Sequence, residues 1–396
     1  MRAILLILDG VGVGDSDLPS ESECNTLASV IEATGCRMST LERLGIANLL
    51  GPPTPHAEAT ASYGKATLAY AGADSYLGHQ EILGVIPPVP TNQLLEVTSD
   101  RICAALVAAG SQVEMLDGGP ALLVDDDVLV GDNLEAAPGQ AVNLIGATTD
   151  MAFQRLEEIG HLVRAEVLNS RVIVCGGRSF GVDDLRANLT RAATGQHGVA
   201  TPSIGLYDNS FQVRHIGLPV DSDSQIHTRL MRNAIHVSLL GKVADLAAGD
   251  VSERDPTVAT SDILDRLEDW QARHKEGFVA ATVQETDLAG HEQDPVRFAS
   301  VLETVDARLR GILECMDQKD LLVVTADHGN DPVNGGGRHS REKVPVLSYR
   351  PGTLATDLGQ RSTLADVAAS IADHFDIRWG GDGISFSHDS VKLPAP

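Results

Sequence analysis

The sequence predicts an α/β fold built on a doubly wound, mostly parallel sheet. Short, continuous apolar runs recur along the chain, and such runs are typical of parallel strands that are buried on both faces. Helical patterns separate the later runs, so that strand and helix alternate. Some runs end in a carboxylate, and ligands of such sheets bind beyond the carboxyl ends of the strands. The expected strands are residues 3–8, 235–240, 278–283, 321–325 and 344–348.

The helices expected between the strands show as apolar stripes. Residues 301–313 carry one stripe and residues 364–375 carry another, with apolar side chains three or four positions apart. Stripes of this width indicate helices that pack one face against the sheet.

Two proline-containing segments, 87–90 and 218–221, interrupt the pattern. We therefore expect an inserted α+β cap or substrate domain at residues 91–222. Residues 1–90 and 223–396 then form a discontinuous, metal-binding catalytic core. Within the insert, strands are expected at 121–124, 142–145 and 172–175, and helices at 94–108 and 153–163.

Composition limits the classes of function. The 396 residues include 55 acidic and 30 basic side chains, a formal charge of -25 that repels a phosphate backbone and argues against nucleic-acid binding. A cationic cofactor suits this charge better, although solubility alone also accounts for an acidic surface. The five cysteines are scattered and form no C-x-x-C pair. The apolar run before Asp9 is short for a signal peptide, and no run could span a membrane, so we expect a cytoplasmic protein without a membrane partner.

The strongest chemical signal is Asp327-His328, which follows the expected strand 321–325 and precedes His339 on the next loop. Carboxylate oxygens and imidazole nitrogens on converging loops are ligands for divalent metals. A strand-end Asp alone is more often a turn or cap residue, but this whole group is not explained that way.

A second group consists of Asp287 and His291, which lie four positions apart after the strand 278–283. Asp9 adds a carboxylate at the tip of the first strand. The complete set is Asp9, Asp287, His291, Asp327, His328 and His339. Six ligands exceed what one tetrahedral ion with an open position needs, so two metal ions are expected.

The attacking group of a two-metal site should be a hydroxyl, and Ser75 is placed just before a helical pattern. The amides at a helix start suit a phosphorylated oxygen, and contact with both metals would lower the pKa of the hydroxyl. On its own, Ser75 would be interpreted as a helix N-cap. Together with the metal ligands it becomes the candidate nucleophile.

The chain resembles the phosphopentomutases, a branch of the alkaline phosphatase superfamily that is related to cofactor-independent phosphoglycerate mutase. The resemblance rests on motifs spread over nearly the whole core: Leu8-Asp9-Gly10, Asp74-Ser75 with Gly78-His79-x-Glu81, Gly290-His291, Thr325-Ala326-Asp327-His328-Gly329 and His339-Ser340-Arg341-Glu342. It implies an alkaline-phosphatase-like fold with an inserted cap.

The resemblance also implies site roles. Asp9, Asp327 and His328 would hold one ion, and Asp287, His291 and His339 the other, with Ser75 bridging them. Manganese is the expected metal, with magnesium or zinc as alternatives. Ser75 would carry the phosphoryl group and exchange it with a sugar phosphate, interconverting 1- and 5-phosphates of ribose or a related sugar, with a sugar bisphosphate as primer.

Asp150 resembles a cap residue that contacts the pentose, and Lys242 resembles a core lysine that faces the phosphate. The sequence departs from the family where Ser75 replaces the usual threonine and where residues 200–205 lack an arginine for the substrate phosphate. Arg178 or Arg214 could supply that contact from another direction, and segment 154–174 is longer than in the family.

Two other functions remain open. A metal-dependent phosphohydrolase would use the same core with a wetter site and release inorganic phosphate. A regulatory protein that only senses a sugar phosphate would not need a metal-binding side chain at all six ligand positions and a hydroxyl at position 75. His79 and Glu81 lie near the nucleophile, and either a catalytic or a supporting role fits them.

Overall fold

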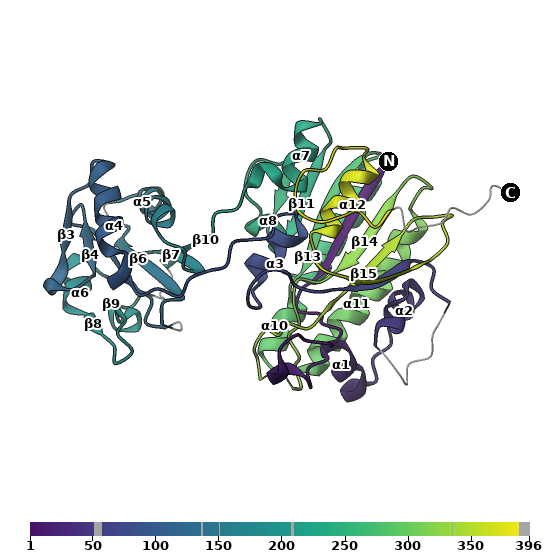
Figure 1. Cartoon of the computed structure of the whole chain (residues 1–396), viewed down its shortest axis with the longest axis horizontal. Coiled ribbons are helices and arrows are strands. Elements are labelled where there is room, and N and C mark those ends of the chain that lie inside the picture. The colour runs from purple at the N-terminus through teal and green to yellow at the C-terminus, as the bar shows by residue number, and fades with distance from the viewer. Residues whose placement is uncertain (51–57, 136–137, 150, 207–209, 335, 388–396) are drawn as a thin grey trace. The chain divides into compact units, whose positions relative to one another are not determined.

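The computed structural model describes residues 1–396 apart from 51–57, 136–137, 150, 207–209, 335 and 388–396. The chain divides into two compact units. The core unit comprises Met1–Pro87 and Val220–Pro396, and the inserted unit comprises Pro88–Pro219. The purple and the yellow ends of the chain accordingly belong to the same unit in Figure 1.

The core unit contains an eight-stranded sheet with the order β12-β11-β13-β1-β14-β15-β2-β16. The five strands from β12 to β14 run parallel, and β15 pairs antiparallel with both β14 and β2. The mostly parallel sheet is therefore confirmed. Its strands are β1 Arg2–Leu8, β2 Ser62–Ala66, β11 Val237–Gly241, β12 Glu253–Asp255, β13 Gly277–Val283, β14 Leu321–Thr325, β15 Val344–Tyr349 and β16 Asp357–Arg361.

The longest apolar runs form the centre of the sheet. Every residue of β1 and of β13 is buried, as expected for strands covered on both faces. The strand expected at 235–240 begins two residues later, because the amide of Ile235 donates to the carbonyl of Leu230 and closes the turn after α7 (Ile226–Arg232). The short, partly polar strands β2, β12 and β16 had no apolar run to predict them.

Helices lie on both sides of this sheet in Figure 1. One layer is α1 Thr26–Thr34, α2 Ser39–Leu44, α9 Thr260–Arg273, α10 Glu285–His291 and α11 Pro295–Glu314, and the other is α3 Ser75–Ile82, α7, α8 Lys242–Leu246 and α12 Asp366–His374. Helix α11 contains the stripe predicted at 301–313. It starts where Asp294 accepts hydrogen bonds from the amides of Val296 and Arg297, with Pro295 in the first turn.

The inserted unit has a six-stranded sheet with the order β10-β7-β6-β5-β4-β3 and a separate β8-β9 pair. Leu144, Val174 and Ile159 belong to its apolar core between sheet and helices. Its strands are β3 Val113–Met115, β4 Leu122–Val124, β5 Val128–Asp132, β6 Ala141–Ala147, β7 Arg171–Gly177, β8 Leu189–Arg191, β9 His197–Val199 and β10 Gln212–Gly217. Its helices are α4 Leu95–Ala108, α5 Phe153–Glu166 and α6 Val182–Ala187.

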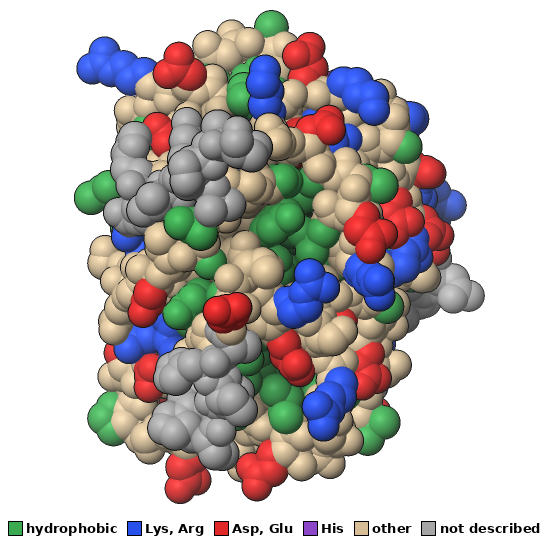
Figure 2. Space-filling model, turned by 90° about the vertical axis from the view of Figure 1, so that its right-hand side faces the viewer, with side chains coloured by type: hydrophobic (Ala, Val, Ile, Leu, Met, Phe, Trp, Pro, Cys, Tyr) green, Lys and Arg blue, Asp and Glu red, His purple; other side chains and the backbone are tan. Residues whose placement is uncertain are grey.

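The surface carries charges of both signs. On the face shown in Figure 2, basic side chains are interspersed with acidic ones. Among the described residues, no helix combines the length and the apolar character needed to cross a bilayer.

Candidate active site

The predicted metal ligands follow the carboxyl ends of three neighbouring strands of the core unit. Asp9 comes directly after β1, and Asp327 and His328 follow β14. Asp287 and His291 lie on α10, which begins just beyond β13. Because β13, β1 and β14 are adjacent and parallel, these side chains emerge at one edge of the sheet.

The hydroxyl of Ser75 lies among these ligands. Ser75 is the first residue of α3, and the carboxylate of Asp74 caps this helix by accepting a hydrogen bond of 3.2 Å from the amide of Leu77. Ser75 Oγ lies 2.9 Å from His328 Nε2 and 3.5 Å from Asp9 Oδ1. The structure thus brings the predicted nucleophile and the predicted ligands together.

The close approach of α3 to the Asp327 loop depends on Gly78. A Cβ atom at this position would lie 2.7 Å from the carbonyl oxygen of Asp327 and 2.8 Å from its Cβ. Any larger residue would therefore push the start of α3, and Ser75 with it, away from the ligands.

Asp9, Asp327 and His328 form one group of buried ligand atoms. One ligand atom of each residue lies within 4.8 Å of the others. His328 Nε2 is 3.7 Å from Asp9 Oδ1 and 3.4 Å from Asp327 Oδ2. Ligand atoms that share one divalent ion at about 2 Å lie about 3–4 Å apart, so this spacing suits a shared cation.

A second group comprises Asp287, His328 and His339. His339 Nε2 lies 3.2 Å from Asp287 Oδ1 and 3.0 Å from His291 Nε2, and His291 Nε2 is 3.5 Å from Asp287 Oδ2. The rings of His328 and His339 stack with their centroids 3.9 Å apart. His328 therefore adjoins both groups, which the ligand sets implied by the family resemblance did not anticipate.

Burial and neighbouring charges set the protonation of this cluster. Burial and the nearby Asp327 carboxylate raise the pKa of Asp9 to about 8. Burial also opposes ionisation of Asp287, but hydrogen bonds from His291 and His339 hold its pKa far below the usual range. Burial lowers the pKa of His328 to about 4, so that its imidazole is neutral at pH 7.

These side chains fit divalent metal ions. Asp9 Oδ2 and Asp327 Oδ2 are buried and accept no well-aligned hydrogen bond from the described residues, although Lys242 Nζ lies 2.7 Å from the first and His79 Nδ1 lies 3.1 Å from the second. A cation between the carboxylates would satisfy these oxygens and remove the repulsion that raises the pKa of Asp9.

Lys242, the first residue of α8, extends into the same cluster. Its Nζ donates to Ser75 Oγ at 3.1 Å and pairs with Asp287 Oδ2 at 3.2 Å, in addition to the Asp9 contact. Burial would lower the pKa of Lys242, but Asp9 and Asp287 outweigh it and raise the pKa above its usual value. The ammonium therefore stays charged beside the candidate nucleophile.

His79 contacts the backbone of Ser75 and the carboxylate of Asp327. Its Nδ1 lies 2.8 Å from the carbonyl oxygen of Ser75 and 3.1 Å from Asp327 Oδ2, while its Nε2 lies 3.0 Å from Thr282 Oγ1. Both neighbours of Nδ1 are acceptors, so this nitrogen carries the proton. His79 thus joins the first turn of α3 to Asp327, and of the two roles left open by the sequence the geometry favours the supporting one.

Glu81 also has a supporting position. Its fully buried carboxylate accepts hydrogen bonds from the amides of Tyr70 and Leu364 at 2.9 and 2.8 Å, from Thr363 Oγ1 at 2.6 Å, and from the amide of Ala69. These contacts anchor α3 to the segment before it and to the segment that leads into α12.

We expect Glu81→Gln to lower the free energy of unfolding by about 2 kcal/mol, because the amide keeps one acceptor oxygen and turns an NH2 group toward backbone donors. The midpoint of urea unfolding measures this loss. Glu276→Gln, at an exposed position of the same unit, is the matched control and should leave the midpoint unchanged.

The predicted substrate-binding residues of the insert have other neighbours. Arg214 lies on β10, and its Nε pairs with Glu157 Oε1 at 2.8 Å. Arg178 has an exposed side chain, and its amide donates to Ser210 Oγ. Asp150 lies outside the described residues. No signal in the sequence pointed to the Glu157 contact, which joins residues 57 positions apart.

The chain is similar over nearly its whole length to known metalloenzymes. The family model described as Metalloenzyme superfamily matches residues 1–378. A phosphopentomutase from Caldanaerobacter subterraneus subsp. tengcongensis is 30% identical over 408 residues, which cover 97% of each chain. A phosphopentomutase from Syntrophotalea carbinolica is 29% identical over 390 residues, which cover 95% of each chain.

Solved structures show a likeness in fold. The Leishmania mexicana phosphoglycerate mutase, solved at low cobalt concentration, aligns with 99% of this chain and 98% of its own, with a TM-score of 0.50 and 12% identity. The alkaline-phosphatase-like fold expected from the sequence agrees with this likeness.

Proposed function

Because this chain belongs to the Metalloenzyme superfamily and, within it, to the phosphopentomutase family, we propose that it moves a phosphoryl group between two hydroxyls of a pentose phosphate or a closely related sugar phosphate. The exchange interconverts the 1- and 5-phosphates through a phosphorylated Ser75. The observation that carries this mechanism is the position of Ser75 Oγ, which lies within 3.5 Å of a carboxylate, an imidazole and an ammonium group.

Divalent metal ions complete the site in this proposal. Asp9, Asp327 and His328 would hold one ion, and Asp287, His291 and His339 the other, with Ser75 in contact with both. Manganese is the proposed metal, with magnesium or zinc as alternatives. When bound, such ions stabilise negative charge on the transferring group and on the serine oxygen.

The protein's own groups act on the two oxygens that exchange the phosphoryl group. The phosphoryl group on Ser75 first passes to the free hydroxyl of the sugar phosphate: the sugar O–P bond forms as the Oγ–P bond breaks, the hydroxyl proton is released to solvent, and the electron pair stays on Ser75 Oγ. Oγ then attacks the phosphorus at the other position of the resulting bisphosphate, where the Oγ–P bond forms as the sugar O–P bond breaks, and the freed sugar oxygen takes up a proton. Lys242 donates a hydrogen bond to Oγ and, as a cation, counters the charge of the phosphoryl group. The amides in the first turn of α3 favour the phosphoserine.

The inserted unit is proposed to cover the sugar and keep water from the phosphoserine. Asp150 is proposed to contact the pentose, and Arg178 or Arg214 to contact its phosphate. The ion pair of Arg214 with Glu157 would have to open for that contact. A sugar bisphosphate is proposed as the primer that phosphorylates Ser75 before the first turnover.

Phosphorus NMR of the Mn²⁺-loaded enzyme with a panel of pentose and hexose phosphates tests the proposal. We expect one pentose 1-phosphate and its 5-phosphate to interconvert, with inorganic phosphate remaining a minor product. Enzyme stripped of metal with a chelator should do neither. Steady release of inorganic phosphate without isomer exchange would instead assign the chain a phosphohydrolase activity.

A further inference from the structure

A second cluster of candidate ligands lies at the opposite, amino end of the core strands. His236 directly precedes β11, Glu253 is the first residue of β12, and His274 directly follows α9 and precedes β13. The strands β11, β12 and β13 are adjacent and parallel. The candidate active site follows the carboxyl ends of its strands, so the His236–Glu253–His274 cluster is a separate place in the core unit.

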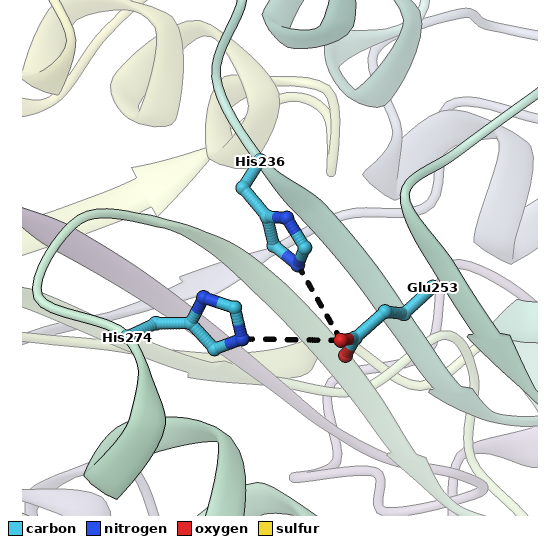
Figure 3. A group of neighbouring side chains, drawn as sticks. All are labelled: His236, Glu253 and His274. Atoms are coloured by element: carbon cyan, nitrogen blue, oxygen red, sulfur yellow. Dashed lines mark ion pairs between the residues drawn. The ribbon is translucent and has the colours of Figure 1, made fainter.

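The three side chains point toward one another (Figure 3). His236 Nε2 and His274 Nε2 each lie 3.9 Å from Glu253 Oε1, and the three ligand atoms are all within 4.8 Å of one another. The imidazole rings of His236 and His274 stack with their centroids 4.3 Å apart. The ring of Trp270 also stacks with His274, with a centroid distance of 5.2 Å. Packing of the rings therefore holds both nitrogens on the side of the carboxylate.

Two of the three side chains have the protonation state that a metal ligand requires. Burial and the neighbouring His236 lower the pKa of His274, so this imidazole is neutral at pH 7. Burial opposes ionisation of Glu253, but hydrogen bonds from Arg273 and Ser238 outweigh it and lower the pKa of its carboxyl. His274 Nε2 is a buried atom with no hydrogen-bond partner among the described residues, which is costly unless something binds it.

We propose that His236, Glu253 and His274 bind one divalent transition-metal ion of the zinc type, separate from the catalytic metals. Two imidazoles and one carboxylate are a known ligand set for zinc. In a tetrahedral site with bonds of about 2.0–2.1 Å the ligand atoms lie about 3.3–3.4 Å apart, so each nitrogen must approach the carboxylate by about half an ångström. The side chains remain partly exposed, which leaves the fourth position to water.

The proposed ion competes with two existing contacts. Arg273 Nη1 lies 3.2 Å from the same Glu253 oxygen, and His236 Nε2 lies 3.1 Å from Ser238 Oγ. The Arg273 side chain is more than half exposed, so it can turn into solvent at small cost. In return, the ion joins the starts of β11 and β12 to the end of α9 and stabilises the folded core by mass action.

Zinc content and thermal unfolding of the full-length protein test the site. After equilibration with Zn²⁺ and removal of loosely held metal, wild type should retain one ion more per chain than His236→Gln, His274→Gln or Glu253→Gln. The unfolding temperature of the wild type should rise further with Zn²⁺ than that of these variants. His161→Gln, at an exposed histidine of the inserted unit, is the matched control and should behave as wild type.

Two further measurements separate this site from a general loss of structure. The three variants should keep wild-type phosphomutase activity with saturating Mn²⁺. Cobalt loaded in place of zinc should give visible absorption bands in wild type that are reduced in the variants. Arg273→Gln should bind zinc more tightly, because it frees Glu253 Oε1. Equal zinc content in wild type and the three variants, or loss of zinc in Arg273→Gln, would overturn the assignment.

Discussion

Replacing Ser75 by alanine is expected to abolish turnover, with a fall in kcat of at least about 10⁴-fold, because loss of a catalytic nucleophile removes the covalent route. The metal content should stay at the wild-type level. Asp9, Asp327 and His328 keep their positions without the hydroxyl, since His79 and Gly10 still contact Asp327. Metal analysis and phosphorus NMR of the same sample measure both quantities.

Ser75→Thr is the matched control, because it keeps a hydroxyl at the start of α3. This variant should show measurable exchange and accept a phosphoryl group that mass spectrometry locates on residue 75. Near-normal rates in Ser75→Ala would remove Ser75 from the mechanism.

Asp327→Asn is expected to lower kcat/KM by about 100-fold or more, which corresponds to about 3 kcal/mol of transition-state stabilisation. The carboxylate is fully buried, accepts a hydrogen bond from the amide of Gly10, and lies within 3.4 Å of His79 and His328 nitrogens. A neutral amide there removes one negative charge from a metal site. Steady-state kinetics at saturating Mn²⁺ measures the effect.

Asp331→Asn is the control, since Asp331 is also fully buried on the same loop but accepts from Ser29 Oγ and the amides of Val333 and Asn334. It should keep the wild-type kcat/KM. If Asp327→Asn had unchanged kinetics at full metal occupancy, Asp327 would not contribute to the electrostatics of the transition state.

The amino-acid sequence alone predicted the central architecture of the core unit. The apolar runs predicted β1, β13 and β14, and the polar residues after them identified the edge of the sheet where a site belongs. These features are local, since a strand buried on both faces must be apolar and its end must turn polar. The ordered motifs around Asp9, Ser75 and Asp327 also indicated the family, which full-length similarity to phosphopentomutases supports.

The contacts of Glu81 and Arg214 could not be predicted from local patterns in the sequence. Glu81 was a second candidate, after His79, for a catalytic role near the nucleophile. Its carboxylate instead accepts hydrogen bonds from backbone amides of the segments before α3 and before α12. Arg214 was a candidate for a phosphate contact, and the structure pairs it with Glu157. In both cases the partner is distant in the chain, so no spacing in the sequence could reveal it.

By itself, then, the sequence determined the central, apolar strands of the core sheet, their polar ends and the family, because burial and turn chemistry act on neighbouring residues. Only the tertiary structure decided that His328 adjoins two ligand groups, that Lys242 lies beside Ser75, and that His236, Glu253 and His274 meet at the other end of the strands. The physical reason is that strand order and register bring these side chains together, and both are fixed by packing of the whole sheet and its helices.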